Sequence, residues 1–266
     1  MAGQHVCSWR PEKHVVSPKR ANSACRLGPP TQNKLIAALP EDDYRRLSVH
    51  LEPVSLPFGG TVIRGGERQR YLHFVTEGIT SCYQLMENGK ATGVAVTGNE
   101  GAIGVASFLG GVSMLSEALV LSAGFAYRLK ADVVRDEFGH GGALPRLLLR
   151  YTAALMAQIG QTAICNRYHS VEQQFCRSIL SCLDRVPLNE LTITQHLIAD
   201  MLGVRREGVT LAAGTLQAAG LIGWSRGRMV VLDRRRLEER VCECYAIDRG
   251  VHEHLIDSET AAGNAA

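Results

Sequence analysis

Between Thr194 and Gly220 apolar residues recur at the three- and four-residue steps of two short amphipathic helices. Thr194 supplies a hydroxyl that can cap the first helix, and Gly203 stands where the chain must turn with little room for a Cβ atom. The apolar positions that this pattern buries are Leu197, Ile198, Ala199, Met201, Leu202, Val204, Val209 and Ala212. The pattern predicts a helix-turn-helix.

The same pattern leaves a solvent face at the start of the second helix. Its residues are Arg205, Arg206, Glu207, Thr210 and Leu211. An arginine fork can donate to both O6 and N7 of guanine, and a carboxylate can accept from N4 of cytosine. We therefore predict that Arg206 and Glu207 read a G·C-containing half-site in a DNA major groove. The alternative is a helix pair of an all-α domain whose charged face is simply solvated.

Two short β-prone runs follow, residues 221–224 and 229–232, separated by four residues that include Gly227. This spacing predicts a hairpin with a glycine turn, so the helix-turn-helix is expected to be winged. Arg226 and Arg228 at the tip are expected to contact DNA phosphates, which position a protein without reading sequence. Alternatively, these two arginines only keep a sheet edge soluble.

Residues 144–166 predict one long helix, with Pro145 in its first turn. A stripe of residues recurs along it at steps of three and four, namely Leu148, Tyr151, Leu155, Ile159 and Thr162. We expect this stripe to be a dimerisation seam, which would place two recognition helices about one DNA turn apart. The alternative is a helix that packs only on its own chain. Another amphipathic helix follows, with the expected hinge at residues 166–170.

Residues 53–129 alternate short β-prone runs with glycine turns, which predicts a small antiparallel β-roll or jelly roll. Residues 31–52 have apolar positions at helical spacing and are expected to pack on the roll as a helical lead-in. Residues 1–30 are polar, basic and proline-containing, so a disordered leader is expected there. The predicted fold class is thus α+β, with an N-terminal β-roll, a long helix and a C-terminal winged helix-turn-helix.

The pattern TQxxxAxxLGVxRExV from Thr194 onward, with a wing after it and a long helix and a glycine-rich β-region before it, resembles the Crp/Fnr family of bacterial transcription regulators. The resemblance covers about residues 31–245. It implies a homodimer on a palindromic promoter site in double-stranded DNA, with RNA polymerase as a further partner. The DNA-binding residues predicted on this basis are Thr194, Gln195, Arg205, Arg206, Glu207, Thr210, Arg226 and Arg228. Leu211 departs from the pattern, because many members have a polar or basic reader there.

The resemblance also divides the chain into domains. The expected ranges are a leader at 1–30, a cyclic-nucleotide-binding-like sensor at 31–143, a dimerisation helix at 144–166, a Crp-type winged helix-turn-helix domain at 167–245 and a tail at 246–266.

In the family that the chain resembles, the roll is the sensory domain. Members that bind cyclic nucleotides have Gly-Glu near the middle of the roll, followed by Arg-Ser or Arg-Thr. Here Val105 follows Gly104, and Ser116 stands at the arginine position with Glu117 beside it. A carboxylate in a confined pocket would repel a phosphate, so cyclic AMP and cyclic GMP are not expected to bind, and the small-molecule effector stays unidentified.

Haem is a second candidate signal, with His73 or Cys82 as its ligand. A lone histidine between apolar neighbours is, however, more often a core or edge residue. No cofactor is therefore expected from the sequence.

Charge and composition add to this interpretation. The formal net charge is only +3, but the segment from Arg205 to Arg240 contains eight arginines and four acids. This excess places positive charge where DNA should lie. No run approaches the roughly 20 apolar residues of a membrane helix, so a cytoplasmic location without membrane contact is expected. The β-region lacks His-x-His, Gly-x-Ser-x-Gly and phosphate-loop motifs, so an enzyme is not expected. A signalling adaptor that uses the roll to bind another molecule is the alternative.

The chain has eight cysteines, which are expected to be reduced thiols. Cys7 and Cys25 stand apart in the leader and no Cys-x-x-Cys occurs, so an iron-sulfur cluster is not expected. Cys165, Cys176 and Cys182 lie beside apolar residues and are interpreted as small core side chains. Cys242 and Cys244 are two apart on a predicted helix and should face different sides, so no metal site is predicted unless the helix ends there. The alternative is a redox- or metal-responsive regulator that uses this last pair.

Overall fold

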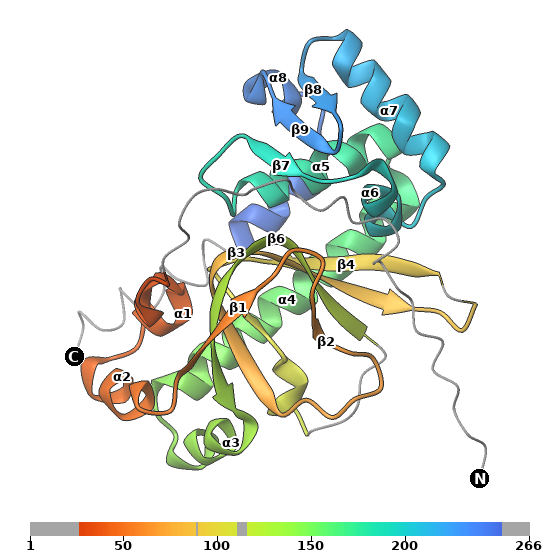
Figure 1. Ribbon diagram of the computed structural model, residues 1–266. Coiled ribbons are helices and arrows are strands. Elements are labelled where there is room, and N and C mark those ends of the chain that lie inside the picture. The colour runs from red at the N-terminus through yellow and green to blue at the C-terminus, as the bar shows by residue number, and fades with distance from the viewer. Residues whose placement is uncertain (1–26, 89, 111–115, 252–266) are drawn as a thin grey trace.

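The computed structural model describes residues 27–88, 90–110 and 116–251. It shows a mixed α and β chain with a large antiparallel sheet in the N-terminal part and helices with a small sheet in the C-terminal part (Figure 1). The predicted leader lies outside the described residues except for its last four positions, and so do Cys7 and Cys25. The predicted fold class is confirmed.

The lead-in to the sheet is helical, as predicted. It consists of η2 (Pro30–Gln32), α1 (Lys34–Ala37) and α2 (Glu41–Ser48). Asn33 fixes this segment to the sheet, because its buried side-chain amide donates to the carbonyl oxygens of Val75 and Gly101, both at 2.8 Å. The Asn33 Oδ1 atom accepts from the backbone at the start of α1, so a single side chain satisfies both elements.

The large sheet has strands β1 (Glu52–Leu56), β2 (Thr61–Ile63), β3 (Tyr71–Leu85), β4 (Ala91–Thr97), β5 (Ala102–Ile103) and β6 (Ser116–Lys130). Its main order is β1-β6-β3-β4, while β2 pairs with β6 and β5 pairs with β3, and all these pairs are antiparallel. The short helix η3 (Val105–Ser107) follows β5. The predicted roll is therefore present.

Glycines let the two longest strands approach closely where their register shifts. A Cβ atom on Gly124 would lie 2.0 Å from the carbonyl oxygen of Glu77, and Gly78 has a φ of 93°. The register between β3 and β6 shifts at this level, which bends the strands as bulges do. Gly78 and Gly124 therefore stand where the curvature of the sheet leaves no room for a side chain.

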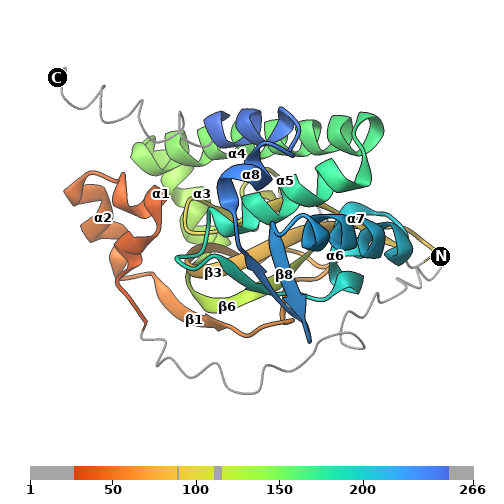
Figure 2. The ribbon, with the colours of Figure 1, turned by 90° about the horizontal axis from the view of Figure 1, so that it is seen from above.

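Two helices follow the sheet, α3 (Ala131–His140) and α4 (Ala143–Tyr168). Helix α4 has 26 residues and is about 39 Å long. It agrees with the predicted long helix to within two residues at each end. Asp43 of α2 accepts from the backbone nitrogen of Ala143 at 2.9 Å and so satisfies a free donor at the start of α4. Both views show α4 along one side of the sheet, with α1 to α3 grouped near its N-terminal end (Figures 1 and 2).

The expected dimerisation stripe on α4 differs from what the structure shows. Leu148, Tyr151 and Thr162 are buried within the chain, and Leu148 and Tyr151 pack in a core with Leu72 and Phe74 of β3. Leu155 is partly buried against the same core, and only Ile159 of the five is exposed. The stripe therefore holds the helix on its own roll, because the helix is apolar on two faces and its spacing alone does not say which face the sheet covers.

The C-terminal part contains α5 (Val171–Leu183), β7 (Glu190–Thr192), α6 (Gln195–Leu202), α7 (Arg206–Ala218), β8 (Ile222–Ser225), β9 (Arg228–Val231) and α8 (Arg234–Glu238). Ser170 and Gln173 form a capping box at the start of α5, so the expected hinge is the short connection between α4 and α5. Residues 244–251 are helical up to the last described position. The expected tail therefore begins inside a helix, and Asp248 in that helix is buried.

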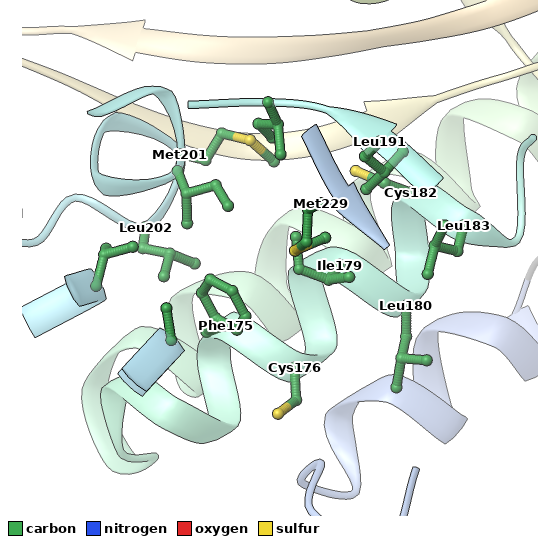
Figure 3. Close-up of a cluster of buried hydrophobic side chains, with 14 of the residues drawn as sticks. Phe175, Cys176, Ile179, Leu180, Cys182, Leu183, Leu191, Met201, Leu202 and Met229 are labelled. Carbon is green, nitrogen blue, oxygen red and sulfur yellow. The ribbon is translucent and has the colours of Figure 1, made fainter. Parts of the chain in front are cut away.

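One hydrophobic core joins the two parts of the chain. Phe175 and Ile179 of α5 pack with Met201 and Leu202 of α6 and Met229 of β9 (Figure 3). The same cluster includes Ile79, Tyr83, Leu119 and Leu121 from the large sheet. Across this junction Arg185 donates to Glu100 at 2.7 Å, and both side chains are buried. The C-terminal part is thus docked on the sheet.

Candidate nucleic-acid interface and sensor cavity

The helix-turn-helix has the predicted local geometry. Thr194 caps α6, since its Oγ1 accepts from the backbone nitrogen of Leu197 at 3.1 Å. Gly203 ends α6 with a φ of 65°, a conformation that a side chain disfavours, and the nitrogen of Val204 then donates to the Ala199 carbonyl. Helix α7 begins at Arg206. The turn therefore presents the first turn of α7 outward.

The predicted base readers are on the surface. Arg205, Arg206, Glu207, Thr210 and Leu211 are all exposed. The Thr210 hydroxyl lies 2.8 Å from Oε1 of Gln195 and 3.0 Å from the Arg206 carbonyl oxygen. This contact links the start of α6 to the first turn of α7, so Gln195 and Thr210 hold the two helices in register.

The wing forms at the predicted hairpin. Arg226 and Gly227 make a two-residue turn with φ angles of 51° and 79°, the left-handed conformation that such hairpins require. Nε of Arg228 donates to Glu190 of β7 at 3.0 Å. The two arginines of the wing therefore differ, because Arg226 is at the exposed tip while Arg228 is engaged by a carboxylate. The third strand, β7, lies beyond the predicted hairpin and pairs with β9.

Positive charge is more localised in the folded chain than along the sequence. Three arginines between Arg205 and Arg240 form ion pairs with acids from outside that segment, namely Arg228 with Glu190, Arg234 with Asp184 and Arg240 with Glu172. Within the described residues no ion pair involves Arg205, Arg206 or Arg226. Apart from Arg236 on α8, the arginines of residues 205–240 that lack an ion pair in the described part of the chain thus lie at the start of α7 and at the tip of the wing, where a phosphate backbone would pass.

The helix-turn-helix packs against the large sheet through backbone contact. A Cβ atom on Gly93 of β4 would lie 2.9 Å from the Met201 carbonyl oxygen, and one on Gly203 would lie 2.7 Å from the hydroxyl of Thr92. Helix α6 therefore lies directly over β4. Arg206 at the start of α7 is exposed in the same arrangement, so the contact between α6 and β4 does not cover it.

A cavity of about 300 Å³ that is partly open to solvent lies between the strands of the roll and α4. Most of its lining is apolar, with a few polar groups. Its lining includes Gln69, Cys82, Ser116, Glu117, Leu155, Met156 and Ile159. Ser116, which the resemblance places at the arginine position, and Glu117 beside it thus both lie at the cavity. In the described part of the chain no lysine or arginine lines it.

The polar groups of the cavity have distinct environments. Burial raises the pKa of the Glu117 carboxyl, while a backbone hydrogen bond from Gly65 and the charge of Arg64 oppose that shift. The Oε1 atom of Gln69 is buried and has no hydrogen-bond partner among the described residues. Burial also raises the pKa of Cys82 to about 11, so its thiol stays neutral. The cavity therefore combines apolar walls with an acceptor and a carboxyl group.

The two residues considered for haem are not brought together at the cavity. Cys82 lines it, whereas His73 is not among the lining residues. Burial lowers the pKa of His73 to about 4, so the ring is neutral, and its Nδ1 has no hydrogen-bond partner in the described residues.

The cysteines are arranged differently from the expectation. Helix α8 ends at Glu238, Cys242 lies in the connection after it, and Cys244 begins the next helix. The expectation that Cys242 and Cys244 face different sides was wrong, because the intervening chain is not helical. Both thiols lie in a cluster with Cys165 at the end of α4. Burial raises the pKa of the Cys165 thiol, and the charge of Arg177 opposes that shift. Cys176 and Cys182 are core side chains, as predicted.

Comparisons with known proteins agree with this geometry. The Crp-like helix-turn-helix domain family matches residues 173–240. FixK2 from Bradyrhizobium japonicum has 18% identity and a TM-score of 0.63, with 72% of this chain and 98% of FixK2 covered. The c-di-GMP responsive regulator CLP from Xanthomonas campestris has 16% identity and a TM-score of 0.60, with 72% and 99% covered.

A regulator of the crp/fnr family from Eubacterium rectale has 19% identity and a TM-score of 0.64, with 77% of this chain and 96% of the regulator covered. No curated protein sequence matches the chain. In the described residues no helix combines the length and apolar content that crossing a bilayer requires. The chain therefore has a Crp-like helix-turn-helix domain and the fold of the Crp/Fnr regulators, which confirms the resemblance seen in its sequence.

Proposed function

We propose that the protein is a cytoplasmic transcription regulator that binds a palindromic DNA site as a homodimer, under control of a small molecule bound in the roll. The observation that carries the proposal is the exposed start of α7, with Arg206 and Glu207 presented by a glycine-ended helix-turn-helix. Arg206 donates to guanine, Glu207 accepts from cytosine, and Arg205 and the wing-tip Arg226 contact phosphates. RNA polymerase as a further partner stays a prediction.

The dimer interface that we propose is the second apolar face of α4. Its centre consists of Leu149, Ala153, Met156, Gly160 and Ile164, all exposed in the single chain and spaced at three and four residues. Met156 is 69% exposed and lies in the middle of this row of exposed positions, and a contiguous exposed apolar face is typical of a protein–protein interface. Small residues at Ala153 and Gly160 allow two such helices to approach closely. Packing along this face would bury the stripe in a coiled coil.

The cavity would couple ligand binding to helix α4. Leu155, Met156 and Ile159 of α4 line it, and Met156 and Ile159 also reach the exposed side of the helix. A ligand that fills the cavity therefore contacts the helix that would form the dimer. The chemistry of the ligand follows from the lining. Apolar walls and the Gln69 acceptor, which has no hydrogen-bond partner among the described residues, favour an uncharged, mostly apolar molecule with a hydrogen-bond donor. Such a ligand shifts the equilibrium between two arrangements of the helix only if it binds one of them more tightly than the other.

Replacing Arg206 by alanine tests the reading role. With a binding site selected from random DNA, we expect Arg206→Ala to weaken binding by about 1–3 kcal/mol and to relax preference at one base pair of each half-site. The measurement is a gel shift on the selected site and on single-base variants of it. Arg236→Ala, an exposed arginine on α8 of the same domain, is the matched control and should leave base preference unchanged. Equal losses on selected and random DNA for Arg206→Ala would exclude Arg206 as a reader.

Cyclic nucleotides are expected not to occupy the cavity. Glu117 would repel a phosphate there, and no described cation of the lining offsets it. Calorimetric titration of the purified protein with cyclic AMP and cyclic GMP should therefore show no tight binding. The same titration of Glu117→Gln, which lacks the negative charge, serves as the comparison. A tight isotherm with one cyclic nucleotide per subunit in the unmodified protein would contradict this assignment.

A further inference from the structure

Four residues with metal-binding side chains meet where the long helix joins the C-terminal part. They are Cys165, His169, Cys242 and Cys244, and their four ligand atoms all lie within 4.8 Å of one another. Cys165 and His169 are one helical turn apart at the C-terminal end of α4, so their side chains share a face. Cys242 and Cys244 flank one residue of the non-helical connection after α8. Two segments far apart in the sequence thus contribute two ligands each.

Two separations among these four atoms match those at a single tetrahedral ion, and all four atoms lie within 4.8 Å of one another. A zinc ion bound at its usual bond lengths separates two thiolate sulfurs by about 3.8 Å and a sulfur from an imidazole nitrogen by about 3.6 Å. Sγ of Cys165 lies 3.6 Å from Sγ of Cys242, and Sγ of Cys244 lies 3.5 Å from Nδ1 of His169. Such a compact set encloses one ion rather than a cluster of several irons.

The surroundings hold the ligands in a binding orientation. The second ring nitrogen of His169, Nε2, lies 3.3 Å from a carboxylate oxygen of Glu243, so Nδ1 is the nitrogen directed at the thiols. Carboxylate–histidine pairs of this kind set the tautomer and orientation of histidine ligands in metal sites. Nε2 of Gln161 donates to Sγ of Cys244 at 2.9 Å. All three cysteines are buried and His169 is half-buried, so the set is closed to solvent on most sides.

We propose that Cys165, His169, Cys242 and Cys244 form a structural site for one tetrahedral divalent ion of the zinc type. Three thiolates and one imidazole are a standard donor set for structural zinc, and thiolates favour such an ion over magnesium or calcium. All four positions are provided by the protein, which is the arrangement of a structural rather than a catalytic site.

The site would fasten the C-terminal segment to the end of α4. His169 is the last residue before Ser170, which caps α5, so the ion would sit at the connection between the long helix and the helix-turn-helix domain. Metal binding would then fix the direction in which the chain leaves α4. That this direction matters for DNA binding rests on the proposed function, whereas the metal site itself does not.

The test measures metal directly in the full chain. Protein purified under reducing conditions, without added chelator, should contain one zinc ion per chain by elemental analysis. After removal of the metal, titration with Co²⁺ should give the intense visible absorption of tetrahedral cobalt and a sulfur-to-cobalt charge-transfer band, both saturating at one equivalent. Zinc should then displace the cobalt and abolish both.

Variants assign the ligands. Cys244→Ser and Cys165→Ser should lose the stoichiometric ion, whereas Cys176→Ser and Cys182→Ser, which alter buried cysteines outside the cluster, should retain it. Glu243→Gln keeps every ligand and changes only an exposed side chain, and it should weaken zinc affinity about 10–100-fold. This variant keeps the proposal testable if the cysteine variants fold poorly.

Several outcomes would overturn the site. One is a folded, fully reduced chain that binds neither zinc nor cobalt. Another is a Cys165–Cys242 disulfide, found by mass mapping in the protein as it is isolated from cells. A third is unchanged zinc affinity in Glu243→Gln together with retention of metal in Cys244→Ser. None of these measurements involves DNA, so loss of the DNA-binding proposal would leave this one standing, and the reverse also holds.

Discussion

Ala153→Arg is expected to convert the proposed dimer into monomers and to lower affinity for the selected palindromic site by about 10²–10⁴-fold. Ala153 lies on the exposed face of α4 between Leu149 and Met156, where two helices would meet near the two-fold axis. The substitution adds bulk to a close contact and places two like charges opposite each other. The loss in affinity follows because two linked half-site contacts bind far more tightly than one.

Sedimentation measures the oligomeric state, and a gel shift on full and half sites measures the loss of linked binding. The matched control is Ala218→Arg, an exposed alanine on another helix, which should remain dimeric. If Ala153→Arg sediments as the unmodified protein does, the exposed face of α4 is not the dimer interface.

Glu100→Ala is expected to lower the free energy of unfolding by about 3–5 kcal/mol, because it leaves the buried Arg185 guanidinium without its partner. Arg185 donates to Glu100 at 2.7 Å and to the Ser181 carbonyl at 2.6 Å. Burial opposes the charge on Arg185, and the neighbouring Glu100 carboxylate outweighs it, so the pKa of the guanidinium is raised. Removing that carboxylate takes away the charge that outweighs the cost of burial, and the Ser181 carbonyl remains as a hydrogen-bond partner.

Denaturant unfolding followed by circular dichroism gives the change in free energy. Glu41→Ala is the control, since Glu41 pairs with Arg45 on the surface and its loss should change stability by less than about 1 kcal/mol. The double variant Glu100→Leu with Arg185→Met should recover much of the loss, because it removes both charges. A Glu100→Ala protein as stable as its parent would mean that the junction does not need this pair.

The docking of the helix-turn-helix on β4 relates the predictions for Ala153→Arg and Glu100→Ala. The Arg185–Glu100 pair, the backbone contact at Gly93 and the shared core around Phe175 all hold the C-terminal part against the roll. A signal that moves α4 would act on this junction as well as on the proposed dimer face. Weakening the junction is therefore expected to change DNA binding in addition to stability.

The sequence by itself determined the features that depend on neighbouring residues. The cap at Thr194, the left-handed turn at Gly203 and the exposed start of α7 follow from local pattern, and each agrees with the structure. The bounds of α4 and the strands of the roll also follow from spacing and glycine turns. These features are local because hydrogen bonds within helices and turns join residues close in the sequence.

The tertiary structure decided which surfaces face each other. Leu148 and Tyr151 belong to a helix that is apolar on two sides, and only the position of the sheet shows that this side packs inward. Cys165 and Cys242 are 77 residues apart and meet only because the C-terminal segment folds back on the end of α4. Contacts between residues so far apart in the sequence are set by how whole helices and strands pack together. No local pattern of residues encodes that packing.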